Sequence, residues 1–343
     1  MTADASPPHA AQLDQLIPPE RRRAVEHALR GAFGDAPVSD LAIVTGGASG
    51  AKIFRVEAAG GAWLLRLESN VGGLHDPVRQ YACMGTAAQA GVAPRVLYAS
   101  PDDGVAITAF VRSSPLTDEE RRVRLPALAR AVAALHRTPL FPRFMELFDA
   151  MDVLLGNVGA SGVLPPAALE RLMRGHRAIA AVYPRGDAEL VSSHNDLNPT
   201  NVLFEGMRPW LIDWEAAFAN DRYFDVAALL NFFATTPDDE ETALRAYFAE
   251  APSGVERARA FLMRQVNRSY YGAMMLQLAV LATPGFRLAE SDLDTPSFRE
   301  AHAAMPPRTG VDGRISFACV FLRDAMHDME SARFAQSIAL VRG

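Results

Sequence analysis

The residues best suited to chemistry lie in one short segment, 192–204. Its sequence, SSHNDLNPTNVLF, sets His194, Asp196 and Asn201 in the spacing H-x-D-x-x-x-x-N. In a tight loop between two short strands, this spacing would point Asp196 at a substrate hydroxyl and turn Asn201 back toward a metal ion. Asp213 follows soon after, at the end of an apolar run. Mg²⁺ takes hard oxygen ligands and keeps several waters, so one Asp and one Asn beside phosphate oxygens suffice to bind it.

Each of these residues also has an ordinary explanation. Asp and Asn in loops are most often turn formers or caps, and a single histidine is more often structural than catalytic. The joint pattern is more informative, because four residues stand at one spacing and each lies beside a strand-like run. We therefore expect a catalytic Asp196, metal ligands at Asn201 and Asp213, and a supporting role for His194 within the loop.

The elements that must position this loop are predicted to be mainly strands in the first third of the chain and mainly helices in the rest. Glycine-punctuated apolar runs predict a five-stranded antiparallel sheet, with one helix inserted between the third and fourth strands. The expected strands cover 41–45, 52–57, 62–67, 96–98 and 105–111, and the inserted helix covers 77–90. Helical spacing predicts helices over 21–33, 118–136, 167–182, 224–234, 238–250, 255–281 and 315–341, with a β-rich patch at 189–213.

This order predicts an α+β chain with two lobes, in keeping with a length of 343 residues. Residues 1–18 read as a flexible tail. We expect a small β-rich lobe over 19–111 and a larger, mainly helical lobe over 112–343.

Composition excludes several classes of protein. With 49% hydrophobic residues, the chain is too apolar to be disordered, and its two cysteines exclude a disulfide framework or a Cys-rich zinc site. A net charge of −6 argues against nucleic-acid binding. The polar N-terminus has no signal-peptide pattern, and the most apolar stretch, 273–282, is too short to cross a membrane. We expect a cytoplasmic protein with neither a membrane nor a nucleic acid as partner.

The segment 189–231 resembles the aminoglycoside phosphotransferase and choline/ethanolamine kinase superfamily, the small-molecule relatives of protein kinases. The loop spacing described above and the following Ile-Asp-Trp-Glu, residues 212–215, match that family's two motifs. The resemblance implies a protein-kinase-like bilobal fold and transfer of the ATP γ-phosphoryl group to a small-molecule alcohol, with ATP and Mg²⁺ as cofactors. Asp225, at the start of the next helix, would brace the catalytic loop.

The resemblance extends to the N-terminal lobe. A glycine-rich segment would cover the phosphates, a cation on the third strand would offset their charge, and the backbone of residues 107–111 would bind adenine. The implied ATP-binding residues are Gly46, Gly47, Ser49, Gly50, Arg66, Ala109 and Val111. One position departs from the family pattern. Where a helical Glu usually pairs with the strand cation, this sequence has Gln80, which leaves open how Arg66 is held.

The acceptor is predicted from resemblance to bacterial choline kinase-like sequences, which share the His-Asn-Asp-Leu form of the loop and an L-x-x-Y-F stretch, here 244–248. Aromatic faces and a carboxylate bind a quaternary ammonium. The candidates for such a cage are Trp214, Glu215, Tyr270 and Tyr271.

Other acceptors stay open at this point. They include homoserine, a thiosugar, a macrolide, or an aminoglycoside, whose several positive charges would call for acids such as Glu290, Asp292 and Asp294. A function of another class is a catalytically weak, kinase-like module that only binds nucleotide. Gln80 is the one feature that supports it.

Overall fold

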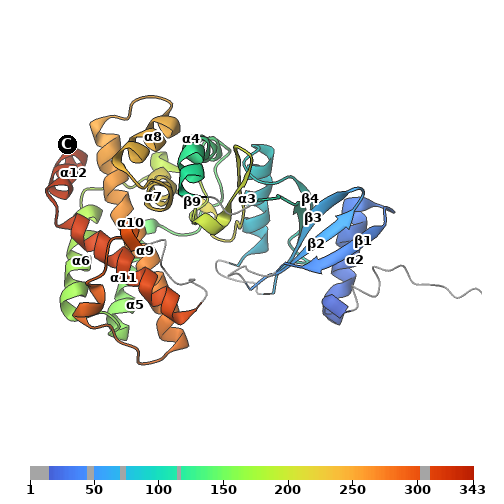
Figure 1. Ribbon diagram of the computed structural model, residues 1–343, viewed down its shortest axis with the longest axis horizontal. Helices are drawn as coiled ribbons and strands as arrows, with labels where there is room; N and C mark the ends of the chain where they lie inside the picture. The colour runs from blue at the N-terminus through green and yellow to red at the C-terminus, as the bar shows by residue number, and fades with distance from the viewer. Residues whose placement is uncertain (1–14, 45–49, 70–74, 114–116, 302–309) are drawn as a thin grey trace, which may run out of the picture.

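The computed structural model describes residues 15–44, 50–69, 75–113, 117–301 and 310–343. A small β-rich lobe is joined to a larger helical lobe (Figure 1). The small lobe holds an antiparallel sheet in the order β1-β2-β3-β5-β4. Its strands are β1 (Val38–Ile43), β2 (Lys52–Ala58), β3 (Gly61–Leu67), β4 (Val96–Ser100) and β5 (Val105–Ala109). The predicted α+β, two-lobed architecture is confirmed, whereas the exact limits of tail and lobes stay predictions.

A tight hairpin sets the register of the sheet. Ala59 and Gly60 both have positive φ, 51° and 73°, as a two-residue turn between right-handed twisted strands requires. Arg66 consequently pairs with Ile53 on β2 and with Ala106 on β5. Since side chains alternate along a strand, Arg66 leaves the sheet on the face opposite Leu65 and Leu67.

The two helices of the small lobe belong to different cores. The helix α2 (Pro19–Phe33) packs Val25 and Leu29 into a core with Phe54 and Leu65 of the sheet. The helix α3 (Pro77–Gln89) instead buries its apolar side in the core of the helical lobe. The Asp76 side chain caps α3 by accepting from the Val78 N–H. The inserted helix is therefore the element through which the small lobe is fixed to the large one.

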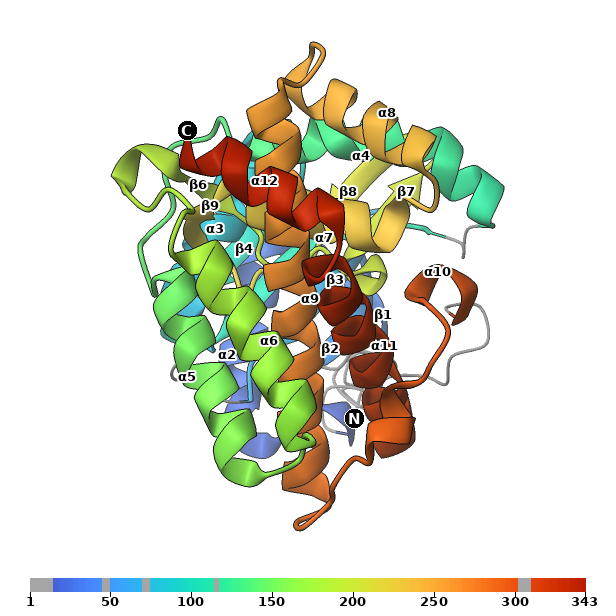
Figure 2. The same cartoon turned by 90° about the vertical axis from the view of Figure 1, so that its left-hand side faces the viewer.

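The large lobe is built around one long central helix, α9, which packs against α5, α7, α11 and α12 (Figure 2). The helices are α4 (Asp118–Leu135), α5 (Leu147–Ser161), α6 (Pro166–Ala180), α7 (Arg222–Phe233), α8 (Pro237–Phe248), α9 (Gly254–Ala282), α10 (Phe298–Ala301), α11 (Val311–Met329) and α12 (Ala332–Arg342). Short 3-10 turns cover Asp187–Glu189, Pro199–Asn201 and Glu290–Leu293. None of the helices in the described ranges has the length and apolar character needed to cross a membrane.

Two helical features differ from the sequence expectation. The helix α5 was not predicted, although Leu147, Met151, Leu154 and Val158 lie at helical spacing and are buried. The single helix expected over 315–341 is two helices, because the Ser331 hydroxyl caps α12 by accepting from the Phe334 N–H.

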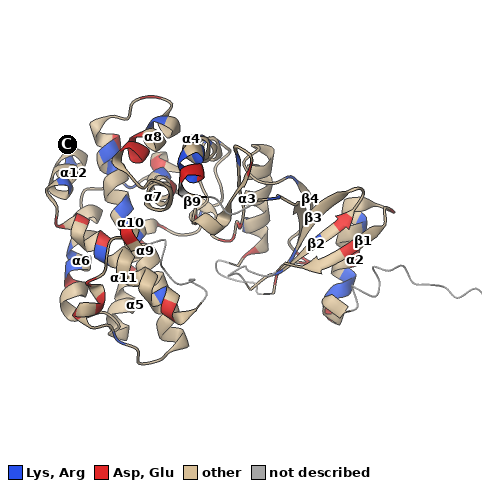
Figure 3. Ribbon diagram, viewed as in Figure 1, with Lys and Arg blue, Asp and Glu red and all other residues tan. Residues whose placement is uncertain are grey.

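Two short ribbons frame the catalytic loop at the junction of the lobes. One pairs β6 (Leu190–Ser193) with β9 (Phe218–Asp221), and the other pairs β7 (Val202–Glu205) with β8 (Arg208–Leu211). Basic and acidic residues are interspersed over the helical lobe in the view of Figure 3.

Candidate active site

The backbone of the predicted catalytic loop is held from below by Asp225, which lies on α7 and is fully buried. Its two carboxylate oxygens accept from the backbone N–H groups of His194 and Asn195, both at 2.8 Å, and His136 Nε2 lies 3.1 Å from Oδ2. Burial alone would raise the pKa of Asp225, but the His136 hydrogen bond and the surrounding donors outweigh it and lower the pKa. A charged carboxylate thus ties the start of the loop to α7.

His194 links the loop to the strand that precedes Asp213. Its Nδ1 accepts from the Asp196 N–H at 3.3 Å, and its Nε2 lies 2.9 Å from the Ile212 carbonyl. This arrangement defines the tautomer with the proton on Nε2, because a carbonyl oxygen only accepts. Both ring nitrogens are occupied, so His194 has no free nitrogen to offer a substrate.

The Asp196 carboxylate is oriented by three neutral donors. Its Oδ1 accepts from the Tyr271 hydroxyl at 2.6 Å and from Asn198 Nδ2 at 3.0 Å, and its Oδ2 accepts from Asn201 Nδ2 at 2.8 Å. The side chain is half-buried between the lobes. A carboxylate fixed in this way can hold a substrate hydroxyl and take its proton.

Asn201 and Asp213 lie side by side, because the Ile212 N–H donates to the Asn201 carbonyl at 3.0 Å. Asp213 adopts a left-handed backbone conformation, with φ at 64°, which turns its side chain out of the line of β8. The Asn201 amide nitrogen is used by Asp196, which leaves its Oδ1 as a free acceptor among the described contacts. One amide oxygen and one carboxylate fit the preference of Mg²⁺ for hard oxygen ligands completed by water and phosphate.

Arg66 is held by Glu68, although the helix carries Gln80 where the family has a glutamate. Its Nε donates to Glu68 Oε1 at 2.6 Å, and Gln80 Nε2 donates to the same oxygen at 3.0 Å. All three side chains are buried. The carboxylate expected on the helix is therefore on the strand side, two residues after Arg66, and the helix supplies a neutral amide that holds it.

The Arg66 guanidinium also reaches across to the large lobe, to Asp213 Oδ1 at 3.3 Å and to Glu215 Oε1. Burial would lower the pKa of Arg66, but the surrounding carboxylates outweigh burial and raise it. Burial raises the pKa of Asp213 and of Glu215, and repulsion from a neighbouring carboxylate adds to it, from Asp196 at Asp213 and from Asp213 at Glu215. Three carboxylates, including Glu68, thus share one guanidinium, and the excess negative charge suits a divalent cation.

Of the remaining predicted nucleotide-binding residues, three belong to the described part of the chain. Gly46, Gly47 and Ser49 fall outside the described residues, and Gly50 is exposed just before β2. Ala109 ends β5, where its N–H already donates to the Arg95 carbonyl at 2.8 Å. Val111 lies two residues beyond and is half-buried.

The predicted aromatic cage is only partly brought together. Trp214 is 2% exposed, because its indole packs under His194 at 4.7 Å between ring centroids. It therefore belongs to the core and offers no face to a ligand. Glu215 is held by Arg66 and by His75 Nδ1, 3.2 Å away, on the phosphate side. Burial therefore argues against Trp214 as a cage residue, whereas a ligand-binding role for Glu215 stays a prediction.

The two tyrosines do lie beside Asp196. Their rings are perpendicular with centroids 5.6 Å apart, and Tyr270 is half-buried. Burial first, and then the Asp196 charge, raise the pKa of the Tyr270 hydroxyl to about 12, so Tyr270 stays neutral. The sequence reasoning missed Glu68, His136 and Asn198 as members of the site.

The family model for the phosphotransferase enzyme family, APH, matches residues 40–262. The chain belongs to this family. It is a phosphotransferase of the superfamily that contains aminoglycoside phosphotransferases and choline kinases, whose members are small-molecule kinases acting on hydroxyl groups. The match includes the sheet, the catalytic loop and the first part of α9.

Solved structures share the fold of this phosphotransferase. A choline/ethanolamine kinase family protein from Mesorhizobium loti is 23% identical, with a TM-score of 0.65, 93% of this chain covered and 99% of the other. The macrolide 2'-phosphotransferase MphH from Brachybacterium faecium is 20% identical, with a TM-score of 0.53 and coverages of 77% and 95%. The streptomycin–ATP–APH(2'')-IIa ternary complex is 14% identical, with a TM-score of 0.55 and coverages of 76% and 90%.

A curated relative from Metamycoplasma hominis, described as an uncharacterized protein, is 23% identical over 172 residues. The match spans 46% of this chain and 31% of the relative, so it concerns a minor part of that longer protein.

Proposed function

We propose that this phosphotransferase moves the γ-phosphoryl group of ATP to the hydroxyl of a small amino alcohol of the choline or ethanolamine type. The observation that carries the proposal is the pair of tyrosines beside a carboxylate oriented by neutral donors. The structural likeness to an enzyme solved with ATP supports ATP as the donor.

Each residue of the site has a definite task in the proposed reaction. Asp196 orients the acceptor hydroxyl and takes its proton as the oxygen attacks phosphorus. Arg66, fixed by Glu68, offsets charge on the phosphates. Asn201 and Asp213 would hold Mg²⁺, which when bound supplies further charge stabilisation to the transferred group.

The acceptor side favours a compact cation. The half-buried Tyr270 places its ring next to the Asp196 carboxylate, and cationic groups are attracted to aromatic faces. Tyr271 is 5% exposed and contributes its hydroxyl to Asp196 instead of a ring face. An amino alcohol carries its hydroxyl close to its cationic nitrogen, so one small molecule can reach both features. The chemistry therefore matches a short, singly charged acceptor.

An aminoglycoside is less well supported. Such a polycation would need several acids, yet Glu290, Asp292 and Asp294 lie in and beside an exposed 3-10 turn. The Asp292 carboxylate is already used there, accepting from the Ala289 N–H at 2.8 Å. The weak-catalysis alternative loses its support too, because Glu68 supplies the carboxylate that Gln80 does not.

The test is Mg²⁺·ATP consumption with a panel of alcohols, in the wild type and in Asp196→Asn. The panel holds choline, ethanolamine, homoserine, a thiosugar, a macrolide and several aminoglycosides. We expect stimulation by choline or ethanolamine that falls at least about 10²-fold in the variant. Stimulation by another acceptor alone would overturn the amino-alcohol assignment, and equal turnover in the variant would overturn the role of Asp196.

A further inference from the structure

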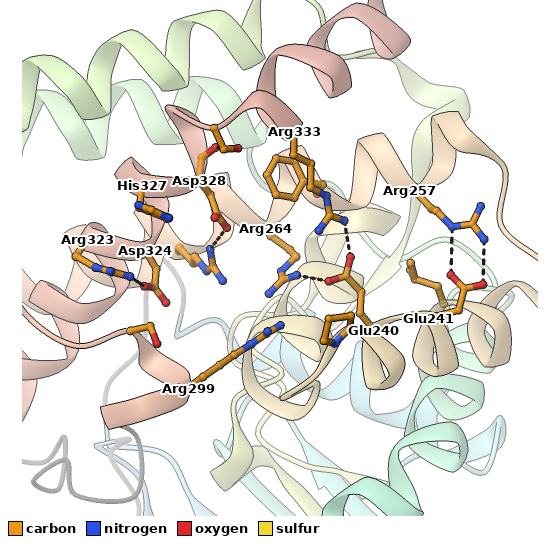
Figure 4. Close-up of a pocket in the computed structure, with 16 residues that line it drawn as sticks. Glu240, Glu241, Arg257, Arg264, Arg299, Arg323, Asp324, His327, Asp328 and Arg333 are labelled. Atoms are coloured by element: carbon orange, nitrogen blue, oxygen red, sulfur yellow. Dashed lines mark hydrogen bonds and ion pairs between the residues drawn. The ribbon is translucent and has the colours of Figure 1, made fainter.

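A cavity lies in the helical lobe, away from the catalytic loop. It encloses about 580 Å³ between α8, α9, α11 and α12 and the segment that carries α10 (Figure 4). No residue between 192 and 215 lines it. The lining is dominated by six arginines: Arg257, Arg264, Arg268, Arg299, Arg323 and Arg333.

Two of these arginines form a fixed floor. Arg264 and Arg268 stand one turn apart on α9 and are 4% and 8% exposed. Burial, reinforced by repulsion from Arg268 and Arg299, lowers the pKa of Arg264 to about 10. The guanidinium groups of Arg268 on α9 and Arg299 on α10 thus lie close enough to Arg264 to repel its positive charge.

The acidic side chains of the cavity hold several of these arginines in place. Glu240 accepts from Arg264 Nη1 at 2.7 Å and from Arg333 Nη2 at 2.6 Å, and Asp328 accepts from Arg268 Nη1 at 2.6 Å. The other two lining carboxylates, of Asp324 and Glu241, pair with Arg323 and Arg257.

Among the described residues that line the cavity, six guanidinium groups and four carboxylates give a formal excess of two positive charges, in a chain whose net charge is −6.

We propose that this cavity binds a small phosphate monoester dianion. The formal excess of two positive charges among the lining residues matches the charge of such a group, and guanidinium forks bind phosphate oxygens in pairs. The carboxylates hold Arg264 and Arg268 in place before a ligand arrives, so little side-chain entropy is lost on binding. In the proposed complex, Arg299 and Arg333 at the exposed rim add contacts to the bound oxygens, Arg333 while it stays bonded to Glu240. The volume exceeds that of phosphate alone and leaves room for an organic substituent.

The test is isothermal titration of the full chain with glycerol 3-phosphate and, separately, with inorganic phosphate. We expect one saturable site whose Kd rises about tenfold or more in Arg299→Gln/Arg333→Gln, since each lost phosphate contact weakens binding by about that factor. Both positions are exposed or half-exposed, so the variant should keep the fold and its Tm. Tighter binding of the ester supports an organic phosphate as the ligand, whereas equal or tighter binding of inorganic phosphate overturns it.

Two controls separate this cavity from the nucleotide site. Arg66→Gln should leave the Kd for glycerol 3-phosphate unchanged, because Arg66 serves the phosphates of ATP. Arg143→Gln removes an exposed arginine that pairs with Asp187 outside the cavity, and should also leave it unchanged. The proposal is overturned by an absence of binding, by an unchanged Kd in the double variant, or by loss of binding in Arg66→Gln alone.

Discussion

The two sides of the catalytic centre are held by opposite kinds of interaction. On the phosphate side, Arg66 is surrounded by Glu68, Asp213 and Glu215, and every contact joins full charges. On the acceptor side, Asp196 is held by a tyrosine hydroxyl and two asparagine amides, which carry no net charge.

The difference reflects what each side has to do. A nucleotide brings several negative charges, which have to be offset by cations held rigidly in a dry site. A catalytic base has to remain available for a proton, so neutral donors can orient it without a salt bridge that would compete for it. On the acceptor side, the charged group is the carboxylate of Asp225, which lies beneath the loop. It accepts hydrogen bonds from two backbone N–H groups and lies beside His136.

The largest effect is expected from removing charge on the phosphate side. Asp213→Asn keeps a residue type that tolerates positive φ but replaces a carboxylate oxygen with an amide. We expect kcat to fall about 10³-fold and the dependence on Mg²⁺ concentration to weaken. Initial rates across a Mg²⁺ series measure both. Asp294→Asn, in an exposed segment, is the control, and an unaltered Mg²⁺ profile in Asp213→Asn would count against its role as a ligand.

The second largest effect is expected on stability, from removing the charge of Asp225 beneath the acceptor side. Asp225→Asn leaves one of two backbone donors unpaired and should lower the free energy of unfolding by about 3 kcal/mol at pH 7. The folded-state pKa of Asp225 is lowered, so its contribution is present above the unfolded-state pKa of about 3.9 and is lost as pH falls through the folded-state value. The gap between wild type and variant should therefore close below about pH 4.

Urea unfolding at pH 7 and at lower pH measures that gap. Asp238→Asn, exposed in the first turn of α8, is expected to change stability by less than about 0.5 kcal/mol. A gap that stays constant with pH would show that Asp225 is not charged in the folded protein.

A smaller effect should follow from disturbing how Arg66 is held. Glu68→Gln removes a buried carboxylate from a charged hydrogen bond worth about 2 kcal/mol, so kcat/KM for ATP should fall about 30-fold. Adding Gln80→Glu to this variant supplies a carboxylate to Arg66 from α3 instead, and should recover most of the lost kcat/KM. Gln80→Glu alone sets two carboxylates together and should also impair ATP use. No rescue in the double variant would refute this account of Arg66.

The smallest effect is expected from one neutral donor. Tyr271→Phe removes a hydroxyl that donates to Asp196 at 2.6 Å, and a net loss of about 1 kcal/mol corresponds to about a fivefold fall in kcat. Steady-state rates over a range of acceptor concentrations separate this from a change in KM. Tyr98→Phe, in the small lobe, serves as the comparison. A loss in Tyr271→Phe as large as in Asp213→Asn would erase the contrast between charged and neutral sides.

Much of the fold was predictable from local pattern. Alternating apolar residues between glycines gave five strands at nearly their observed bounds, and the catalytic loop was visible because its chemistry is compressed into eight residues. The helix α5 was missed although its apolar spacing was regular, because Gly156 and Gly159 lower its helical propensity and packing on α9 compensates.

The site was predictable where neighbours in sequence are neighbours in space. Arg66 and Glu68 are two residues apart at the end of a strand and share a face, so their pairing had a local signal. The contact of Gln80 with Glu68, and that of Tyr271 with Asp196, join distant elements and had none. Trp214 was assigned to the cage because an aromatic residue beside a predicted metal ligand gives the same sequence pattern whether its ring faces the core or a substrate.

At two loop positions, both the backbone conformation and the side-chain contacts restrict which residue can stand there. Asn195 and Asp213 both have left-handed backbones, with φ at 63° and 64°, so before any chemistry is considered the chain accepts mainly glycine, asparagine or aspartate there. At Asn195 the side chain then joins the loop to β9 through Asn220, and at Asp213 it accepts from Arg66 Nη1 at 3.3 Å. Substitution at these positions is consequently biased toward residue types that tolerate positive φ, of which glycine would keep the shape of the loop while removing its polar side chain. A descendant that lost activity but kept its fold could arise by a single change at Asp213.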